Sequence, residues 1–187
     1  TDEPLDGGVI RYLDSLRTNL FRQGLFAEFE LRIHELAAKG EPLNGENLSA
    51  LYLELVREYY GHAAGICEVK DIYRAEWAYI PHFYYNFYVY QYATSMVSSI
   101  KIADGIRAEA AAVPASTAKR DAYLTMLASG SSRYAFDMLK EAGVDMTTPA
   151  PFAAAMKEMN RIIDAMEAIL DRREGREGKT GVKPSAP

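Results

Sequence analysis

The chain has 187 residues, a net charge of -5 and one cysteine, Cys67. Its length suits a single domain with a real core, and one cysteine excludes an internal disulfide framework and fits a reducing compartment, so we expect a cytoplasmic protein. The net negative charge argues against a nucleic-acid partner. The sequence contains no run of about 20 apolar residues, so no membrane span is predicted.

The first predicted element covers residues 9–36, where apolar residues recur at helical spacing. The pattern indicates one long helix, or two that are nearly continuous. We expect the helix to stop at Gly40, followed by Pro42, because glycine accepts the left-handed cap conformation and proline cannot continue the helical hydrogen bonds.

A second helix is predicted to start after the N-cap Asn44 and to end at Gly61. The periodicity then weakens as far as Pro81, which predicts a short helix or a turn. From Phe83 the sequence is expected to be helical again to about Gly105.

Three further helices complete the prediction. Pro114 is expected to open one that ends at Ser129-Gly130, and residues 134–141 form a short one capped by Gly143. A threonine cap followed by proline at residues 147–149 starts the last helix. Its expected buried stripe contains the following apolar residues: Phe152, Met156, Met159, Ile163, Met166 and Leu170.

The sequence has no strand alternation, so the predicted fold class is all-α, a multi-helix bundle. We expect one helical domain over residues 1–173. Residues 174–187 contain three glycines, two prolines and no core residues, which predicts a disordered tail.

One candidate for metal binding is the pair His34-Glu35, because H-E-x-x-H on a helix places two histidines one turn apart to hold zinc. Here Ala38 occupies the place of the second histidine. We therefore interpret the pair as ordinary polar residues near a helix end.

Other reactive residues match no catalytic pattern. The spacing of His62, Cys67 and Glu68 fits no common zinc site, so this chain is predicted to bind no metal. Gly130-Ser131-Ser132 is not the G-x-S-x-G motif that presents a nucleophilic serine, and it is interpreted as a turn between helices.

The most unusual segment is aromatic. Of the 13 tyrosines, seven lie between residues 73 and 92. If the chain is helical from Phe83, Tyr85, Tyr88 and Tyr92 share one stripe, with His82 beside them. Buried hydroxyls need hydrogen-bond partners, so the stripe indicates either a wall facing a cleft or an aromatic core helix whose hydroxyls reach backbone carbonyls.

These and other residues resemble a known family, oligoendopeptidase F, over most of residues 21–146. The resemblance rests on the following segments: Phe21-Arg22-Gln23, Phe26-Ala27-Glu28-Phe29-Glu30, His34-Glu35, Tyr59-Tyr60-Gly61, Trp77, Ile80-Pro81-His82-Phe83-Tyr84, Phe87 to Thr94 and Ala142-Gly143-Val144-Asp145-Met146. The block from His82 to Thr94 is the most specific of them, since so many uncommon residues coincide there.

The resemblance implies a helical zinc metalloendopeptidase whose deep channel admits short peptides. In that family the zinc is held by H-E-x-x-H and a further glutamate, which lie N-terminal to the part that this chain resembles. The chain is therefore expected to be the C-terminal part of the catalytic domain, to need the remaining N-terminal part as its partner, and to be inactive alone.

The resemblance also implies roles for residues of the aromatic block. In related thimet-type peptidases a histidine and two tyrosines bind the substrate and stabilise the tetrahedral intermediate. By motif, His82 takes the histidine role, and Tyr85 and Tyr92 take the two tyrosine roles. Tyr88 remains a rival for Tyr85, because the offset from His82 to Tyr85 is shorter than in the thimet-type motif, and Tyr88 is expected to contact substrate with His82.

Two departures from the family pattern are Ser95, where glycine is common, and Ala135, where proline is usual. They bear on helix ends rather than on the site. Two other functions remain open: a non-catalytic helical module that binds peptides or a partner helix through the same aromatic residues, and a structural bundle whose tyrosines form the core.

Overall fold

The computed structural model describes residues 3–173 of the chain. That part is helical and contains no strand, which confirms the all-α prediction. The described residues divide into two compact units, which we call the aromatic unit (residues 17–97) and the flanking unit (residues 3–16 and 98–173). The single domain expected over 1–173 stays a prediction, since two compact units can belong to one domain. The tail predicted to be disordered, 174–187, lies outside the described residues.

The N-terminal helical run has three parts, α1 (Glu3–Leu16), the π-helical turn η1 (Arg17–Arg22) and α2 (Gln23–Ala38). They follow one another directly, which confirms the long helical run expected from the apolar spacing. Gly40 lies just beyond α2 with a φ angle of 77°, a conformation that glycine adopts without steric cost. The predicted end of the helix is thus confirmed.

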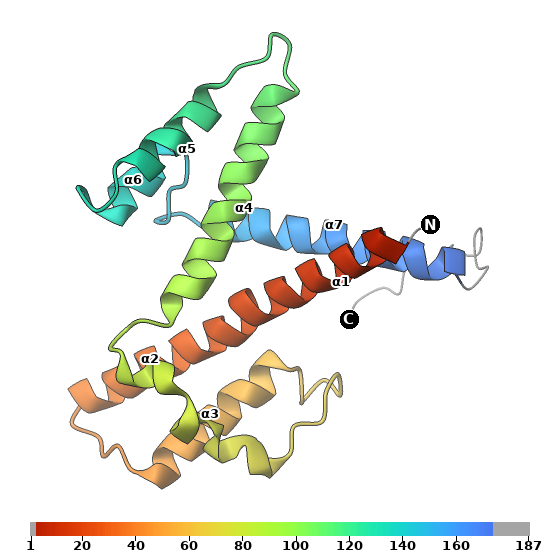
Figure 1. The fold of residues 1–187 in the computed structure, drawn as a ribbon. Coiled ribbons are helices and arrows are strands. Elements are labelled where there is room, and N and C mark those ends of the chain that lie inside the picture. Colours follow the sequence, from red (N-terminus) through yellow and green to blue (C-terminus); the bar gives the residue numbers. More distant parts are fainter. Residues whose placement is uncertain (1–2, 174–187) are drawn as a thin grey trace. The chain divides into compact units, whose positions relative to one another are not determined.

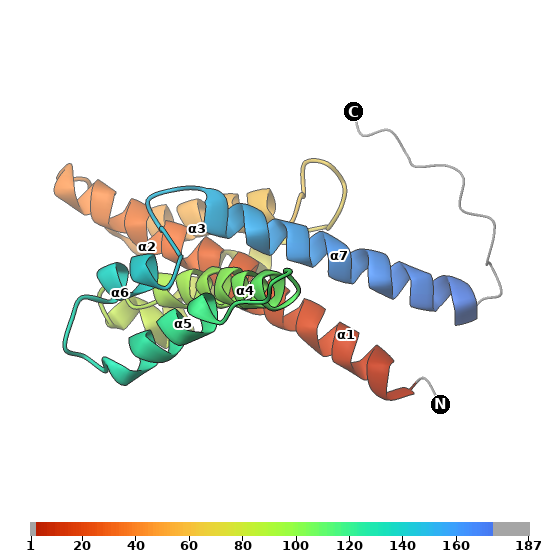
Figure 2. The ribbon, with the colours of Figure 1, turned by 90° about the horizontal axis from the view of Figure 1, so that it is seen from above.

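The next elements of the aromatic unit are α3 (Gly45–Tyr59) and the 3₁₀ helix η2 (Asp71–Tyr79). The side chain of Asn44 accepts a hydrogen bond from the backbone N–H of Asn47 at 2.9 Å, which confirms the predicted N-cap. Helix α3 packs along α2 and also against η2 (Figures 1 and 2).

A hydrophobic core lies at the centre of the aromatic unit. It contains the following buried side chains: Leu25, Phe26, Phe29, Tyr52, Leu55, Val56, Val69, Ile80 and Val89. Phe29 is at its centre, with ring centroids 5.2 Å from Tyr52 and 5.1 Å from Phe83. Because aromatic pairs at such spacings favour edge-on or tilted geometry, these contacts fix the segment that carries Phe83 relative to α2 and α3.

The prediction of a helix that starts at Phe83 is wrong for the first third of that segment, before Tyr90. The 3₁₀ helix η3 covers Pro81–Tyr84, and α4 (Tyr90–Ala110) begins only at Tyr90. Between them Asn86 and Phe87 have φ angles of 46° and 56°, in the left-handed region that a right-handed helix cannot contain. Tertiary contacts to α2, described below, hold this loop in place of the helical hydrogen bonds.

The flanking unit contains α1, the second part of α4, α5 (Ala118–Ala128), α6 (Ala135–Glu141) and α7 (Ala150–Arg173). Helix α1 packs along α7, and α5 packs against α6 (Figures 1 and 2). The predicted boundaries of α6 are confirmed to within one residue, and α7 begins directly after the predicted threonine–proline start at residues 147–149. No helix within residues 3–173 is both long enough and apolar enough to cross a bilayer.

Helix α5 starts four residues after the predicted Pro114. The reason is the position of the side chains that can accept its first free N–H groups. Ser116 Oγ accepts from the N–H of Ala118 at 3.2 Å, and the carboxylate of Glu109 accepts from the N–H of Lys119 at 2.6 Å. Because these groups have no partner within the helix, the acceptors fix where it begins.

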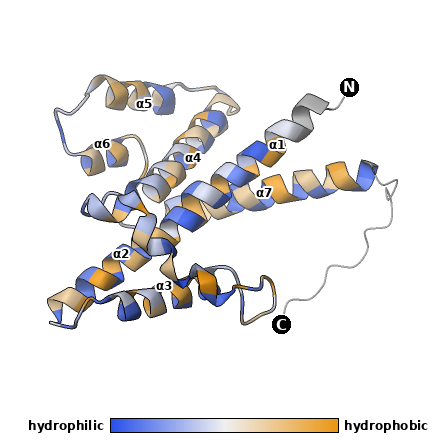
Figure 3. Ribbon diagram, turned by 60° about the horizontal axis from the view of Figure 1, so that its bottom comes forward, coloured by the Kyte–Doolittle hydropathy of each residue, from blue (hydrophilic) through white to orange (hydrophobic). Residues whose placement is uncertain are grey.

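The prediction of a buried apolar stripe on α7 is wrong for three of its residues, which lie toward the two ends of the helix. Phe152, Met156 and Leu170 are 41%, 36% and 43% exposed. The buried face is displaced by one residue and contains Pro151, Ala155, Glu158 and Ile162. Figure 3 shows hydrophobic and hydrophilic residues in alternating bands along α7.

Candidate active site

The predicted site residues lie in three consecutive elements of the aromatic unit. His82 is in η3, directly after Pro81, and Tyr92 is in the first turn of α4. Tyr85 and Tyr88 lie in the loop between these elements, so the continuous helical stripe expected from the sequence is wrong. The loop nevertheless brings the four side chains together, which we call the His82 cluster (His82, Tyr85, Tyr88 and Tyr92).

The closest polar contact in the cluster joins His82 Nε2 and Tyr92 Oη at 3.2 Å. The two rings are almost perpendicular, at 83°, with centroids 5.5 Å apart. A hydrogen bond with Tyr88 raises the pKa of Tyr92. The phenol of Tyr92 therefore stays protonated at neutral pH and can donate a hydrogen bond.

Tyr88 lies at the middle of the cluster and Tyr85 at its edge. The Tyr88 ring stacks on His82 at 11° and 5.9 Å, and it meets Tyr92 edge-on at 5.7 Å. Tyr85 contacts the Tyr88 ring at 5.9 Å and is 63% exposed. Tyr88 is therefore closer to His82 and Tyr92, whereas Tyr85 presents more of its surface to solvent.

The second nitrogen of His82 is in an unusual environment. His82 Nδ1 is buried and has no hydrogen-bond partner within the described part of the chain. Because an unsatisfied buried nitrogen costs free energy, most such atoms in folded proteins are paired. Gln23 Oε1 and Arg57 Nε are unpaired in the same way, so this feature does not by itself mark His82 as reactive.

Helix α2 holds the loop of the cluster. The carboxylate of Glu30, only 1% exposed, accepts a hydrogen bond from the backbone N–H of Phe87 at 2.7 Å. The His34 ring lies against the Phe87 ring, with centroids 4.2 Å apart. Glu30 is not among the site residues predicted from the sequence, although a carboxylate beside Phe26 and Phe29 on the apolar side of a helix is a usable signal.

Comparison with known proteins identifies the family. The profile of Peptidase family M3 matches residues 10–158, which is most of the chain. This chain belongs to peptidase family M3. Its resemblance to oligoendopeptidase F is likewise confirmed by the relatives described next.

Oligopeptidase PepF of Bacillus subtilis is 45% identical over 158 residues, which are 84% of this chain and 22% of that protein. The chromosomal oligoendopeptidase F of Lactococcus lactis subsp. cremoris is 42% identical over 161 residues, 86% of this chain and 25% of that protein. The crystal structure of oligoendopeptidase-F from Enterococcus faecium matches with a TM-score of 0.79 and 36% identity, covering 89% of this chain and 30% of that one. The M3 chain thus spans about a quarter of the length of these curated relatives.

A second polar network of the M3 chain fixes η2, which precedes the cluster. Glu76 pairs with Arg22 and accepts a hydrogen bond from Tyr52 Oη at 2.8 Å. Burial, followed by the bond to Glu76, raises the pKa of Tyr52. Trp77 Nε1 donates to Ser49 Oγ at 3.1 Å. These three contacts tie η2 to η1 and α3, so the chain enters Pro81 and His82 from a fixed position.

The residues considered for metal binding do not converge. Glu35 is exposed, and His34 Nδ1 contacts the backbone oxygen of Glu30 at 2.8 Å. His62 Nδ1 accepts from the N–H of Val69 at 3.1 Å. Among residues 3–173 there is no group of three histidine, cysteine, aspartate or glutamate side chains that could hold a metal ion. These residues do not by themselves fit the zinc that the family resemblance implies.

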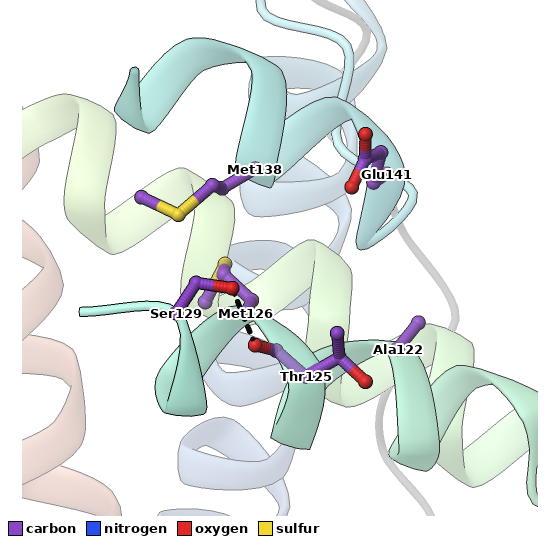
Figure 4. A pocket seen from close by; sticks show the side chains of 6 residues that line it. All are labelled: Ala122, Thr125, Met126, Ser129, Met138 and Glu141. Atoms are coloured by element: carbon purple, nitrogen blue, oxygen red, sulfur yellow. Dashed lines mark hydrogen bonds between the residues drawn. The ribbon is translucent and has the colours of Figure 1, made fainter. Parts of the chain in front are cut away.

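A shallow pocket of about 160 Å³ lies between α5 and α6. Met138 and Glu141 of α6 face Ala122, Thr125 and Met126 of α5, together with its C-cap Ser129, across the pocket (Figure 4). Glu141 is paired with Arg133 at 2.7 Å. The volume is below the roughly 300 Å³ of usual small-molecule sites, and the pocket lacks convergent reactive groups. Residues 130–132 form the predicted turn, which connects α5 and α6.

Proposed function

We propose that this chain is the C-terminal part of a zinc oligopeptidase of the oligoendopeptidase F type. In this proposal it forms one wall of the channel that binds short peptides, and it supplies hydrogen-bond donors for the transition state. Membership of peptidase family M3 supports the reaction class, and relatives named oligopeptidase and oligoendopeptidase F support the substrate class.

The observation that carries the proposal is the contact between His82 Nε2 and Tyr92 Oη at 3.2 Å. When water attacks a peptide carbonyl, the carbon becomes tetrahedral and its oxygen gains negative charge. A neutral phenol and an imidazole N–H, held side by side, can donate to that oxygen once the substrate replaces the contact between them, because one proton cannot serve both bonds. Since the two rings already lie beside one another, this exchange needs little rearrangement during the reaction.

Each residue of the His82 cluster has a role in the proposal. Tyr92 donates its hydroxyl proton in a hydrogen bond to the oxyanion, and its raised pKa keeps that proton in place beyond neutral pH. His82 donates from Nε2 to the same oxygen or to a neighbouring carbonyl. Tyr88 orients both rings and contacts the peptide, and the more exposed Tyr85 is the second candidate for the other tyrosine donor.

The zinc belongs to the part of the enzyme outside this chain. When bound, the metal would polarise the carbonyl and activate water, which is its general role in peptidases. The roles assigned to His82 and the tyrosines do not pass through the metal. They depend only on hydrogen bonds from this chain to the substrate.

The experiment is Tyr92→Phe in the complete peptidase that contains this segment, assayed on a short fluorogenic peptide. Loss of one oxyanion donor should lower kcat about 100-fold. Tyr90→Phe is the matched control, because Tyr90 lies in the same turn of α4 outside the cluster, and it should leave kcat unchanged.

A fall in kcat of less than about threefold in Tyr92→Phe would contradict the proposed role, since one oxyanion donor contributes far more. The isolated 187-residue chain should hydrolyse nothing, with or without added zinc. Cleavage by the isolated chain that a chelator abolishes would instead mean that it holds its own metal. Peptide binding without turnover in the complete protein would favour a non-catalytic binding module.

A further inference from the structure

The backbone between Tyr85 and Tyr88 adopts a conformation that its own residues disfavour. Asn86 and Phe87 have φ angles of 46° and 56°. Asparagine tolerates the left-handed region, but an aromatic side chain seldom occupies it. A phenylalanine persists there only where surrounding contacts hold it. Whatever holds Phe87 therefore controls the path of the chain into Tyr88.

Two residues of α2 hold Phe87. Glu30 Oε1 accepts the hydrogen bond of the Phe87 N–H at 2.7 Å, and the His34 ring lies at 36° to the Phe87 ring with centroids 4.2 Å apart. Glu30 and His34 are four residues apart and so share one face of the helix. The helix thus contacts both the backbone and the side chain of the same loop residue.

A carboxylate at this position is costly for stability alone. Glu30 is 1% exposed, next to the apolar core residues Phe26 and Phe29. Burying a charge removes its hydration, and an apolar side chain of similar size would avoid that penalty. What the carboxylate adds is a strong charge-assisted hydrogen bond to one backbone N–H. That N–H belongs to the strained residue of the loop.

The consequence reaches the reactive groups through Tyr88, the next residue in the chain. The Tyr88 ring stacks on His82, and its hydrogen bond with Tyr92 is the main cause of the raised pKa of Tyr92. If the loop relaxed toward a right-handed conformation at Phe87, the direction of Tyr88 would change. Both contacts of Tyr88 would then be lost together.

We propose that Glu30 is a positioning residue for the His82 cluster: its buried carboxylate fixes the left-handed backbone at Phe87 and thereby sets Tyr88 against His82 and Tyr92. The effect on turnover rests on the function proposed above. The effect on the loop does not, so the two can be tested separately.

The test compares Glu30→Ala with Glu30→Gln in the complete peptidase. Alanine removes the acceptor, and kcat should fall about 10- to 100-fold, the size expected for a hydrogen bond to a charged group, while KM changes less than about threefold. Glutamine keeps an oxygen in the same place, so kcat should return to within about threefold of the parent. Glu35→Ala, an exposed carboxylate on the same helix, is the matched control and should change nothing.

A second measurement follows the loop directly. Hydrogen–deuterium exchange at the Phe87 amide should be at least about tenfold faster in Glu30→Ala and near the parent rate in Glu30→Gln. Exchange and kcat that both stay unchanged in a folded Glu30→Ala protein would overturn the proposal. Equal losses of kcat in both variants would also overturn it, since the acceptor oxygen would then be irrelevant.

The outcomes separate this proposal from the proposed function. If Tyr92→Phe lowers kcat but Glu30→Ala does not, the donors stand and the positioning role fails. If Tyr92→Phe has no effect while the Phe87 amide of Glu30→Ala exchanges faster, the proposed function fails and Glu30 still fixes the loop. Should Glu30→Ala not fold, Glu30→Gln decides: parental kcat and exchange support the acceptor role, and their loss refutes it.

Discussion

The loop from Tyr85 to Tyr88 and helix α7 are held in shape by different kinds of contact. The loop has two residues with positive φ, and its N–H at Phe87 bonds to a buried carboxylate 57 residues away in sequence. Helix α7 satisfies its backbone internally, and it leaves Phe152, Met156 and Leu170 partly exposed. The loop therefore depends on remote residues for its conformation, whereas α7 needs its neighbours only to choose which face is covered.

This difference bears on where function can lie. A conformation imposed by tertiary contacts can place polar groups where a regular helix could not, as the loop does with Tyr88 between His82 and Tyr92. Such groups are fixed relative to one another before any ligand binds, which is what transition-state stabilisation requires. A regular helix with one covered face can vary its exposed residues at little cost.

The largest expected effect is on the core beneath the loop. Phe29→Ala should lower the free energy of unfolding by about 3–5 kcal/mol, because it leaves a cavity where a fully buried ring meets Tyr52 and Phe83. Met156→Ala on α7 should cost less than about 0.5 kcal/mol, since that side chain is 36% exposed. Denaturant unfolding of each variant measures both values. Equal losses in the free energy of unfolding would mean that the two regions depend on side-chain packing to the same degree.

A smaller effect is expected from the backbone of the loop. Asn86→Val should cost about 1–2 kcal/mol, because a β-branched residue is disfavoured at a φ of 46°. Ser95→Val, an exposed position in the regular part of α4, serves as the control and should be close to neutral, since serine and valine have similar helix propensities. If thermal or denaturant unfolding finds both variants alike, the loop is not held in the left-handed conformation in solution.

The smallest effects concern pH, and they have opposite signs in the two units. Burial, followed by a hydrogen bond to Glu28, raises the pKa of Tyr59 in the aromatic unit to about 12. Its contribution to stability is thus complete below the unfolded value of about 10 and is lost as pH rises toward 12. The hydrogen bond from Arg161 lowers the pKa of Glu158 on α7, whose contribution is present above its ordinary value near 4.5 and is lost as pH falls through the lowered value.

Unfolding midpoints measured across pH check both signs. Tyr59→Phe should reduce the loss of stability between about pH 10 and 12, and Glu158→Gln should reduce the loss below about pH 4.5. Each substitution should leave the other end of the pH profile unchanged, because the two residues belong to different units. A profile in which either variant alters both ends would contradict this assignment.

Much of the fold follows from local pattern. Apolar spacing, the Asn44 cap and the stop at Gly40 predict the helices from α1 to α3, because they act through hydrogen bonds and conformations within a few residues. The same reasoning predicts α6 and α7. Local pattern places the start of α5 too early, at Pro114. The start is set instead by the side-chain acceptors of Ser116 and Glu109, which a rule based on proline does not take into account.

For the candidate site, the amino-acid pattern alone shows which residue types are concentrated between residues 81 and 92, and the resemblance implies the expected roles of His82, Tyr85 and Tyr92. It could not predict the loop, because the residues there are compatible with a helix and the competing contact comes from Glu30 on another element. Nor could it decide which face of α7 is covered, since apolar residues occur on more than one side. Both depend on the folded chain, because the buried hydrogen bond to Phe87 and the covering of one face of α7 involve residues that only folding brings together.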